Sequence, residues 1–437
     1  MQPTSGVLQR TPPEIWLSIF ECATFVPHAF DTDVTDPFDV HGSPTPFDHS
    51  VERRLQASLS TKRSLVLVCK LWHDLATPLL YQAVTARDNV SLRSLNNAIS
   101  GHSSASRKLR VRRLDLLRWP RNQTPLASDV LSELLHQLPS VEILCLATYP
   151  YFTTIDSDGC DLTRAFDAAE AESLLEALLA APVRTTLRKC IIGPSFIHVK
   201  QSNALLSHCT RLSCLFVFSH IRYPFREGQV IPARLPLTCL SVECEDTPSA
   251  MASGVWHQMQ PHPSLQHVHI LLRSIVRIYH ESTETFLRTQ GVYLRTIQLS
   301  IGKYQWDRCV APFLHLLATH CPNLIHLIFI CDSRGPVLFR TPLPPTVTHF
   351  GIYSMIDNSE QGLCDYLGQI ERFLGQRCHV PGVIRRLNAS TQEEWDYLRE
   401  DPELLARYAA LPVPSHCRLE DAEGRDLMLR MRSSLSS

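Results

Sequence analysis

A short apolar pattern recurs nine times after residue 105 and constrains the fold of this chain more than any other feature. Each copy has apolar residues at its first, fourth and sixth positions, as in Leu212, Leu215 and Val217. Six successive copies begin at residues 187, 212, 237, 265, 294 and 324, so neighbouring copies lie 25 to 30 residues apart. A period of this length is typical of solenoids, in which each unit buries its apolar face by stacking on its neighbours. The nine copies begin at Val111, Val141, Leu187, Leu212, Leu237, Leu265, Leu294, Leu324 and Val347.

Helical spacing of apolar residues fills several of the gaps between these copies. Apolar residues recur three or four positions apart at 131–138, 170–180, 203–209, 283–290 and 310–320. Alternation of strand and helix predicts an α/β fold, and the pattern resembles the leucine-rich-repeat family. The resemblance implies a curved, irregular solenoid over residues 105–390, although the Asn or Cys that usually follows the strand is mostly missing. The alternative is an ordinary α/β domain with a parallel sheet.

In a solenoid of this kind, the side chains between the apolar positions point to the concave face. Several of these positions are apolar or aromatic, which is typical of a contact site. The alternative is that a loop or the C-terminal segment of the same chain covers them. We expect target-protein binding on the concave face at Phe216, Phe218, His267, His269, Ile328, Ile330 and Tyr353.

Two apolar segments near the N-terminus predict a small helical module. Residues 11–25 predict a helix that Thr11 caps, with Pro12 in the first turn and Glu14 completing a capping box. Residues 26–62 are rich in proline and aspartate and predict a flexible loop. Helical spacing returns at Ser64, where a second apolar side must be covered by a partner or by the following domain. One apolar side of this predicted helix is formed by Leu65, Val68, Trp72, Leu75 and Leu79, and the second by Leu67 and Leu71.

These two segments resemble the F-box motif. The segment Pro12-Pro13-Glu14-Ile15 runs on to Ile19-Phe20, and Val68-Cys69-Lys70-Leu71-Trp72 follows in the expected order. The resemblance implies a three-helix module at residues 8–85, which docks on the S-phase-kinase-associated adaptor subunit of a cullin-RING ubiquitin ligase. The sequence departs from the motif at Thr11, where leucine is usual, and through the insertion at 26–62. Docking or core roles are implied for Pro12, Pro13, Ile15, Ile19, Phe20, Val68, Cys69 and Trp72.

Composition gives no support to nucleic acid or membrane lipid as the main partner. The 42 Lys and Arg residues nearly balance the 43 Asp and Glu residues, and the formal net charge is -1. Residues 1–10 lack the apolar core of a secretory signal, and the longest apolar run, 324–331, is too short to span a bilayer. We therefore expect a soluble protein of the cytoplasm or nucleus.

No motif for metal binding, cofactor binding or catalysis stands out. The 15 cysteines include no C-x-x-C pair, and the histidines at 257–269 lack the paired spacing of a zinc site. There is no P-loop, nucleophile elbow or dinucleotide fingerprint. We expect no metal, no cofactor and no catalytic residue. The basic run from Arg107 to Arg113 is interpreted as a solvated edge strand, with a nuclear-import or phosphate-contacting patch as the alternative.

The order of the two regions predicts a non-catalytic adaptor that docks on a ubiquitin ligase and binds a target protein on its solenoid. One alternative is a protein-interaction scaffold with a degenerate F-box; another is an intracellular hydrolase or metalloprotein. Residues 391–410 predict one or two helices that cap the array, with a second start after Asp401-Pro402. The remaining tail, 417–437, is interpreted as a frayed helix or a disordered segment.

Overall fold

The computed structural model divides the chain into two compact units. The first comprises residues 1–32, 48–197 and 208–212, and the second comprises 33–47, 198–207 and 213–437. The boundary lies within the predicted solenoid, so its first repeats share a unit with the N-terminal helices. The structure describes residues 11–34, 36–40, 49–101, 109–118, 127–148, 168–192, 205–217, 235–244, 260–272, 280–301, 310–331, 342–354, 361–375 and 379–435.

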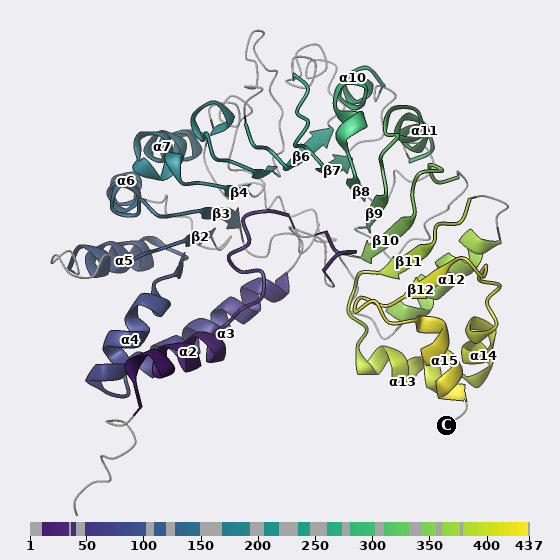
Figure 1. The fold of residues 1–437 in the computed structure, drawn as a ribbon, viewed down its shortest axis with the longest axis horizontal. Coiled ribbons are helices and arrows are strands. Elements are labelled where there is room, and N and C mark those ends of the chain that lie inside the picture. Colours follow the sequence, from purple (N-terminus) through teal and green to yellow (C-terminus); the bar gives the residue numbers. More distant parts are fainter. Residues whose placement is uncertain are drawn as a thin grey trace, which may run out of the picture. The chain divides into compact units, whose positions relative to one another are not determined.

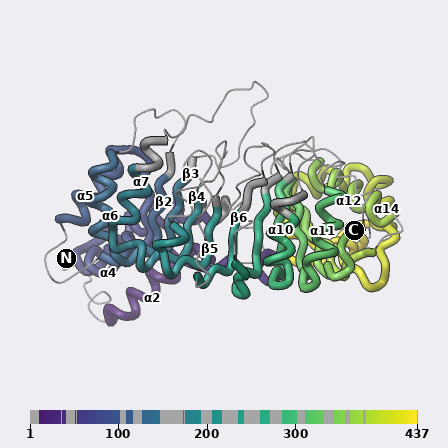
Figure 2. Tube along the Cα trace, turned by 90° about the horizontal axis from the view of Figure 1, so that it is seen from above, coloured from purple at the N-terminus to yellow at the C-terminus, as the bar shows by residue number. Residues whose placement is uncertain are grey.

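In the first unit, helices α2 to α4 come before a parallel sheet in the chain. Strands β1 to β4 pair in chain order, and α5, α6 and α7 lie side by side along them (Figures 1 and 2). Paired positions such as Leu114, Leu144 and Cys190 are fully buried and form one face of the sheet. The elements are α2 (Pro13–Ala23), α3 (His49–Val66), α4 (Lys70–Leu80), β1 (Ala83–Ala86), α5 (Asn89–Gly101), β2 (Arg113–Arg118), α6 (Ser128–Gln137), β3 (Ile143–Thr148), α7 (Ala168–Ala180), the 3-10 helix η2 (Pro182–Thr185) and β4 (Lys189–Ile192).

The second unit continues the strand–helix alternation and ends in a group of short helices. Its eight strands, β5 to β12, also pair in parallel and in chain order (Figure 1). The elements are β5 (Cys214–Val217), β6 (Cys239–Cys244), β7 (His267–Leu272), α10 (His280–Gln290), the 3-10 helix η4 (Gly291–Tyr293), β8 (Thr296–Ile301), α11 (Ala311–His320), β9 (His326–Cys331), β10 (His349–Ser354), α12 (Gly362–Leu374), β11 (Val383–Arg386), α13 (Gln392–Glu400), α14 (Pro402–Ala409), β12 (Arg418–Glu420) and α15 (Leu427–Leu435).

All nine copies of the apolar pattern form strands, β2 to β10, which confirms the predicted α/β fold with parallel pairing. The fourth position of every copy is at most 2% exposed and belongs to the core. In the second unit, the ring of Phe350 on β10 lies edge-on to that of Phe329 on β9 at 5.1 Å and is tilted by 33° against that of Phe373 of α12 at 6.0 Å. Burial of such side chains, each worth about 1.5–3 kcal/mol, holds the helices to the sheet.

The prediction of a flexible loop at 26–62 is wrong for its second half, because α3 occupies 49–66. The sequence of α3 is polar, and its inward side carries Ser58 and Lys62 as well as Leu55. Ser58 donates a hydrogen bond to the carbonyl oxygen of Thr24 at 2.7 Å, and burial lowers the pKa of Lys62. Polar residues on the buried side hide the helical periodicity in the sequence.

In the first half of the predicted loop, residues contact other parts of the unit to which they belong. In the first unit, Arg113 donates to the carbonyl oxygen of Ala29 at 3.0 Å and Lys189 to that of Asp31 at 3.3 Å. The guanidinium of Arg112 lies over the ring of Phe30 at 5.1 Å. Residues 26–31 therefore have defined contacts even though they form only turns.

The predicted capping box at Thr11 is also wrong. Helix α2 begins at Pro13, its N-cap is Pro12 with φ -54° and ψ 142°, and no side chain caps it. A residue that precedes proline is pushed out of the helical region by the proline ring, so Pro13 excludes Pro12 from the helix. A capping box forms instead at α13, between Thr391 and Glu394.

Arg113 begins β2, which lies between β1 and β3, so the basic run does not form an edge strand. Its charges are paired: Arg112 contacts Glu142 at 2.7 Å and Arg113 contacts Asp115 at 2.9 Å. Lys108 and the start of the run lie outside the described residues.

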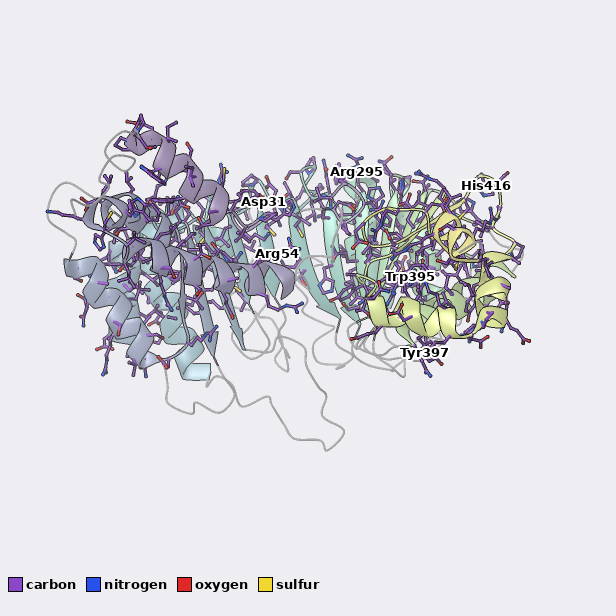
Figure 3. The ribbon with its side chains drawn as sticks, turned by 90° about the horizontal axis from the view of Figure 1, so that it is seen from below. Asp31, Arg54, Arg295, Trp395, Tyr397 and His416 are labelled. Carbon is purple, nitrogen blue, oxygen red and sulfur yellow. The ribbon has the colours of Figure 1, made fainter. Side chains whose placement is uncertain are left out.

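The C-terminal cap has more structure than the sequence predicted. Helices α13 and α14 confirm the two expected helices, with Asp401 capping the second. The tail forms β12 and α15, so it is neither wholly frayed nor disordered. Trp395 and Tyr397 both project from α13 (Figure 3), and the guanidinium of Arg430 on α15 stacks 4.0 Å from the Trp395 ring. Among the described residues, no helix combines the length and apolar content needed to cross a bilayer.

Candidate functional site

An aromatic cluster fixes the three N-terminal helices to one another. Trp72 of α4 lies 5.1 Å from Trp16 and 4.8 Å from Phe20, both on α2. Phe20 is buried with Ala76 and Leu79 of α4, and Leu65 and Val66 at the end of α3 pack on the same cluster. The three helices therefore pack on one another through their inward sides. Their outward sides are available for other contacts.

The outward sides carry a set of large apolar residues that are open to solvent. Ile15 is 51% exposed and Ile19 is 47% exposed, and both lie one helical turn apart on α2. Leu67 is 82% exposed and Val68 is 56% exposed, in the turn between α3 and α4, and Leu71 follows on α4. These five residues are here named the α2–α4 apolar surface.

The turn between α3 and α4 explains why its apolar residues are exposed. Helix α3 ends at Val66, and the backbone N–H groups of Leu67 and Val68 donate to the carbonyl oxygens of Ser64 and Leu65 at 3.2 and 3.3 Å. Cys69, in extended conformation, is the N-cap of α4. The two turn residues therefore lie outside both helices. Leaving such side chains in water forgoes about 1 kcal/mol or more for each, which favours a partner that covers them.

The eight residues that the F-box resemblance singled out divide into two groups. Phe20 and Trp72 belong to the aromatic core of the module, and Cys69 is half-buried. Pro12, Pro13, Ile15, Ile19 and Val68 are exposed. Leu67 and Leu71 complete the surface, although only the second apolar side in the sequence pointed to them. The indole Nε1 atoms of Trp16 and Trp72 are buried and have no hydrogen-bond partner in the described part of the chain.

In the second unit, the strand register places the predicted concave-face residues in rows. Cys214, Cys239, His267, Thr296, His326 and His349 are paired neighbours in the first row. The next row contains Ser241, His269, Gln298, Ile328 and Gly351. The face that carries these rows, opposite the helices, is here named the inner face.

The residues predicted to bind a target on this face are mostly buried. Phe216, His269, Ile328 and Ile330 are at most 1% exposed, and Tyr353 is also buried. His267 is half-buried, and Phe218 lies outside the described residues. This burial agrees with the alternative that a segment of the same chain covers these positions, and target binding at them stays a prediction.

Buried polar side chains on the inner face satisfy one another in part. His269 lies between two hydroxyl groups, with Nδ1 2.9 Å from Ser241 Oγ and Nε2 2.8 Å from Ser300 Oγ. In the described part of the chain, Gln298 Oε1 and His267 Nδ1 are buried without a hydrogen-bond partner. An unpaired buried polar atom costs about 1–3 kcal/mol, so this face retains unused hydrogen-bonding capacity.

A segment of the chain's own loop supplies a carboxylate to the inner face. Asp36 is buried, and its carboxylate accepts a hydrogen bond from Thr296 Oγ1 at 2.5 Å and lies 2.6 Å from Nδ1 of His326. Burial opposes ionisation of Asp36, but the hydrogen bond and charge of His326, with the bond from Thr296, outweigh it and lower its pKa. An ionised carboxylate only accepts, so Nδ1 of His326 carries the proton in this contact.

Burial disfavours the thiolate form of four cysteines. Burial raises the pKa of Cys209 and Cys321 to about 12, and that of Cys364 and Cys417 to about 11. Thiolate is the reactive form of cysteine, so these thiols are inert near neutral pH. They act as small core residues.

No protein-family model matches the chain, and no curated protein matches its sequence. The function must therefore be inferred from the two surfaces themselves.

Proposed function

We propose that this protein is a non-catalytic, substrate-recognition adaptor of a cullin-RING ubiquitin ligase, with an F-box-like module and a leucine-rich-repeat-like solenoid. The α2–α4 apolar surface would dock on the S-phase-kinase-associated adaptor subunit, and the strand–helix repeats would bind a target protein. Ubiquitin transfer would be carried out by other subunits of the ligase, so no catalytic residue or cofactor is required in this chain.

The observation that supports this proposal most is the exposure of five large apolar side chains on α2, on α4 and in the turn before α4, in a module whose helices already pack on one another. Ile15, Ile19 and Val68 occupy positions that the F-box resemblance assigns to docking or to the module's core. Apolar residues that cluster on an otherwise well-packed small module are typical of a protein-binding surface. Leu67 and Leu71 are also exposed, at 82% and 37%.

A pull-down with the purified S-phase-kinase-associated adaptor subunit tests the proposal. The variant Ile15→Asp/Val68→Asp places charge on the surface without touching the aromatic core, and we expect it to lose about 30-fold or more in affinity. Val90→Asp is the matched control, because Val90 is an apolar residue of the same unit that is 74% exposed on α5. Equal recovery of the wild type and the double variant would contradict docking at this surface.

The alternative is a protein-interaction scaffold in which the N-terminal helices only cap the array. A specific observation favours keeping it: α4 contacts β1, the first strand of the sheet in the first unit. The scaffold predicts no recovery of the ligase subunit with any variant. It also predicts that removal of residues 1–80 unfolds the first unit.

A further inference from the structure

Residues 36–40 lie on the inner face of the second unit although they belong to neither a helix nor a strand. Asp36, Pro37 and Phe38 are buried there, and Asp39 and Val40 are exposed. The segment is held in a tight turn, because the N–H groups of Asp39 and Val40 both donate to the carbonyl oxygen of Asp36 at 3.0 and 2.9 Å. A short turn with two anchoring side chains has the form of a bound peptide.

The Asp36 carboxylate is recognised from three directions. Thr296 on β8 and His326 on β9 contact one oxygen, Oδ2, and the backbone N–H of Phe38 donates to the other, Oδ1, at 2.9 Å. Thr296 and His326 are paired neighbours in the first row of the inner face. These contacts select a carboxylate, because a neutral amide at this position would lose the charge-assisted hydrogen bond to His326.

The Phe38 ring packs between two histidines and an arginine. Its centroid lies 5.0 Å from the ring of His326, 5.2 Å from that of His349, and 5.1 Å from the guanidinium of Arg385. This position of the Phe38 ring requires a glycine at 351, because a Cβ atom there would lie 3.2 Å from Cζ of Phe38 and 2.9 Å from Cδ1 of Leu387. The aromatic ring is stacked on a cation, tilted by 42° against the imidazole of His326 and edge-on to that of His349.

The site also forms a hydrogen bond with the backbone of the segment. Arg385 Nη1 donates to the carbonyl oxygen of Pro37 at 2.7 Å, while its Nη2 and Nε contact Glu420 at 2.6 and 3.0 Å. The two bonds to Glu420, on the neighbouring strand β12, do not involve the segment. The side chains that contact the segment at Thr296, His326, His349 and Arg385 come from strands β8 to β11.

From this arrangement we infer that the inner face between β8 and β12 is a peptide-binding site for an acidic residue followed two positions later by an aromatic residue, and that Asp36–Phe38 occupies it in cis. A target peptide of the same chemistry would replace the segment and would reproduce its contacts to Thr296, His326 and Arg385. A ligand without a carboxylate is disfavoured, because His326 and Thr296 would be left buried without their acceptor. The inference deepens the proposed function and rests on it, since the peptide would belong to the target protein.

The unpaired atoms beside the site agree with a longer ligand. Gln298 lies two residues after Thr296 on the same strand and is 97% buried, and its Oε1 has no partner among the described residues. His267 Nδ1 on β7, which is likewise unpartnered there, lies opposite Thr296 in the strand register. Segment 33–40 uses neither atom in the described structure, whereas a partner peptide extending toward β7 can donate to both.

The test uses a fluorescently labelled peptide of residues 33–40, Asp-Val-Thr-Asp-Pro-Phe-Asp-Val, and full-length protein. The variant Asp36→Ala/Phe38→Ala vacates the site, and we expect the peptide to bind it about tenfold or more tightly than it binds the wild type, as measured by fluorescence anisotropy. A peptide with Asp36→Asn and one with Phe38→Ala should bind neither protein. Equal binding to both proteins, or no binding to a vacated protein whose circular dichroism is unchanged, would overturn the inference.

A second measurement on the wild type covers the case in which the vacated variant does not fold. Excess unlabelled peptide should raise the hydrogen-exchange rate of the backbone amides of Phe38, Asp39 and Val40, because displacement frees them; the Asp36→Asn peptide should not. Unchanged exchange would reject displacement. Neither measurement involves the ligase subunit or the α2–α4 apolar surface, so failure of ligase docking and failure of this site give different results.

Discussion

The α2–α4 apolar surface and the inner face of the second unit differ in chemistry and in what covers them. The first is built from aliphatic side chains such as Ile15 and Leu67 and is exposed within its own unit. The second is built from histidine, threonine and arginine, and the chain's own Asp36 and Phe38 fill part of it. An aliphatic surface suits a partner that remains bound, whereas a filled polar site suits a ligand that must compete. The two proposals therefore assign a lasting contact to the first surface and an exchangeable contact to the second.

The largest expected effect separates the two sides of α2. Phe20→Ala should destabilise the first unit by about 3–5 kcal/mol, because it empties the aromatic core of the module. Ile19→Ala, one position earlier, should cost about 0.5 kcal/mol or less, because the side chain is already half exposed. Urea denaturation monitored by tryptophan fluorescence measures both. Similar losses for the two variants would show that Ile19 is not part of an open surface.

A smaller effect is expected at the filled site. Asp36→Ala should cost about 1–3 kcal/mol in the free energy of unfolding, because Thr296 and His326 lose their common acceptor inside the protein. Asp39→Ala in the same turn is the matched control, and its carboxylate is exposed, so we expect a change within about 0.5 kcal/mol. If the two substitutions have equal effects, the carboxylate of Asp36 does not anchor the segment.

The smallest effect concerns pH and distinguishes the histidine-lined face from the aliphatic surface. Burial lowers the pKa of His349, as it does that of His267. Below an unfolded-state pKa of about 6.5, the unfolded chain binds protons that the folded chain does not, so stability is full above that pH and falls with acidification. We expect the denaturation midpoint to decrease as the pH is lowered from 7.5 to 5.5, and to decrease less in the His349→Gln variant. An equal decrease in both proteins would exclude His349 as a source of the pH dependence.

The repeats could be predicted from the sequence because each strand carries its own local signal. Leu212, Leu215 and Val217 show the pattern without reference to any other part of the chain, and the same holds for the other eight copies. Strand β11 was missed because it carries Arg385 and Arg386, whose burial is possible only with Glu420 and Glu394 as partners. The sequence pattern predicts neither α5 nor α12, and it predicts a loop at α3 because Ser58 and Lys62 are buried in that helix.

The two candidate surfaces differ in the same way. Ile15, Ile19 and Val68 could be chosen from the sequence because a local motif contains them, although the motif could not separate them from Phe20 and Trp72, which pack inward. Asp36 could not be chosen, because its partners Thr296 and His326 are 260 and 290 residues away in the chain. Only the pairing of the strands brings those partners into one row.

Hydroxyl-radical footprinting of the full-length protein, with and without the S-phase-kinase-associated adaptor subunit, tests the central claim most directly, because it reports on individual side chains. We predict that oxidation of Ile15, Ile19, Leu67, Val68 and Leu71 falls when the subunit is added. Oxidation of the exposed controls Val90 and Leu429 should stay unchanged. Labelling of the five residues that does not change at saturating subunit concentration would contradict the account.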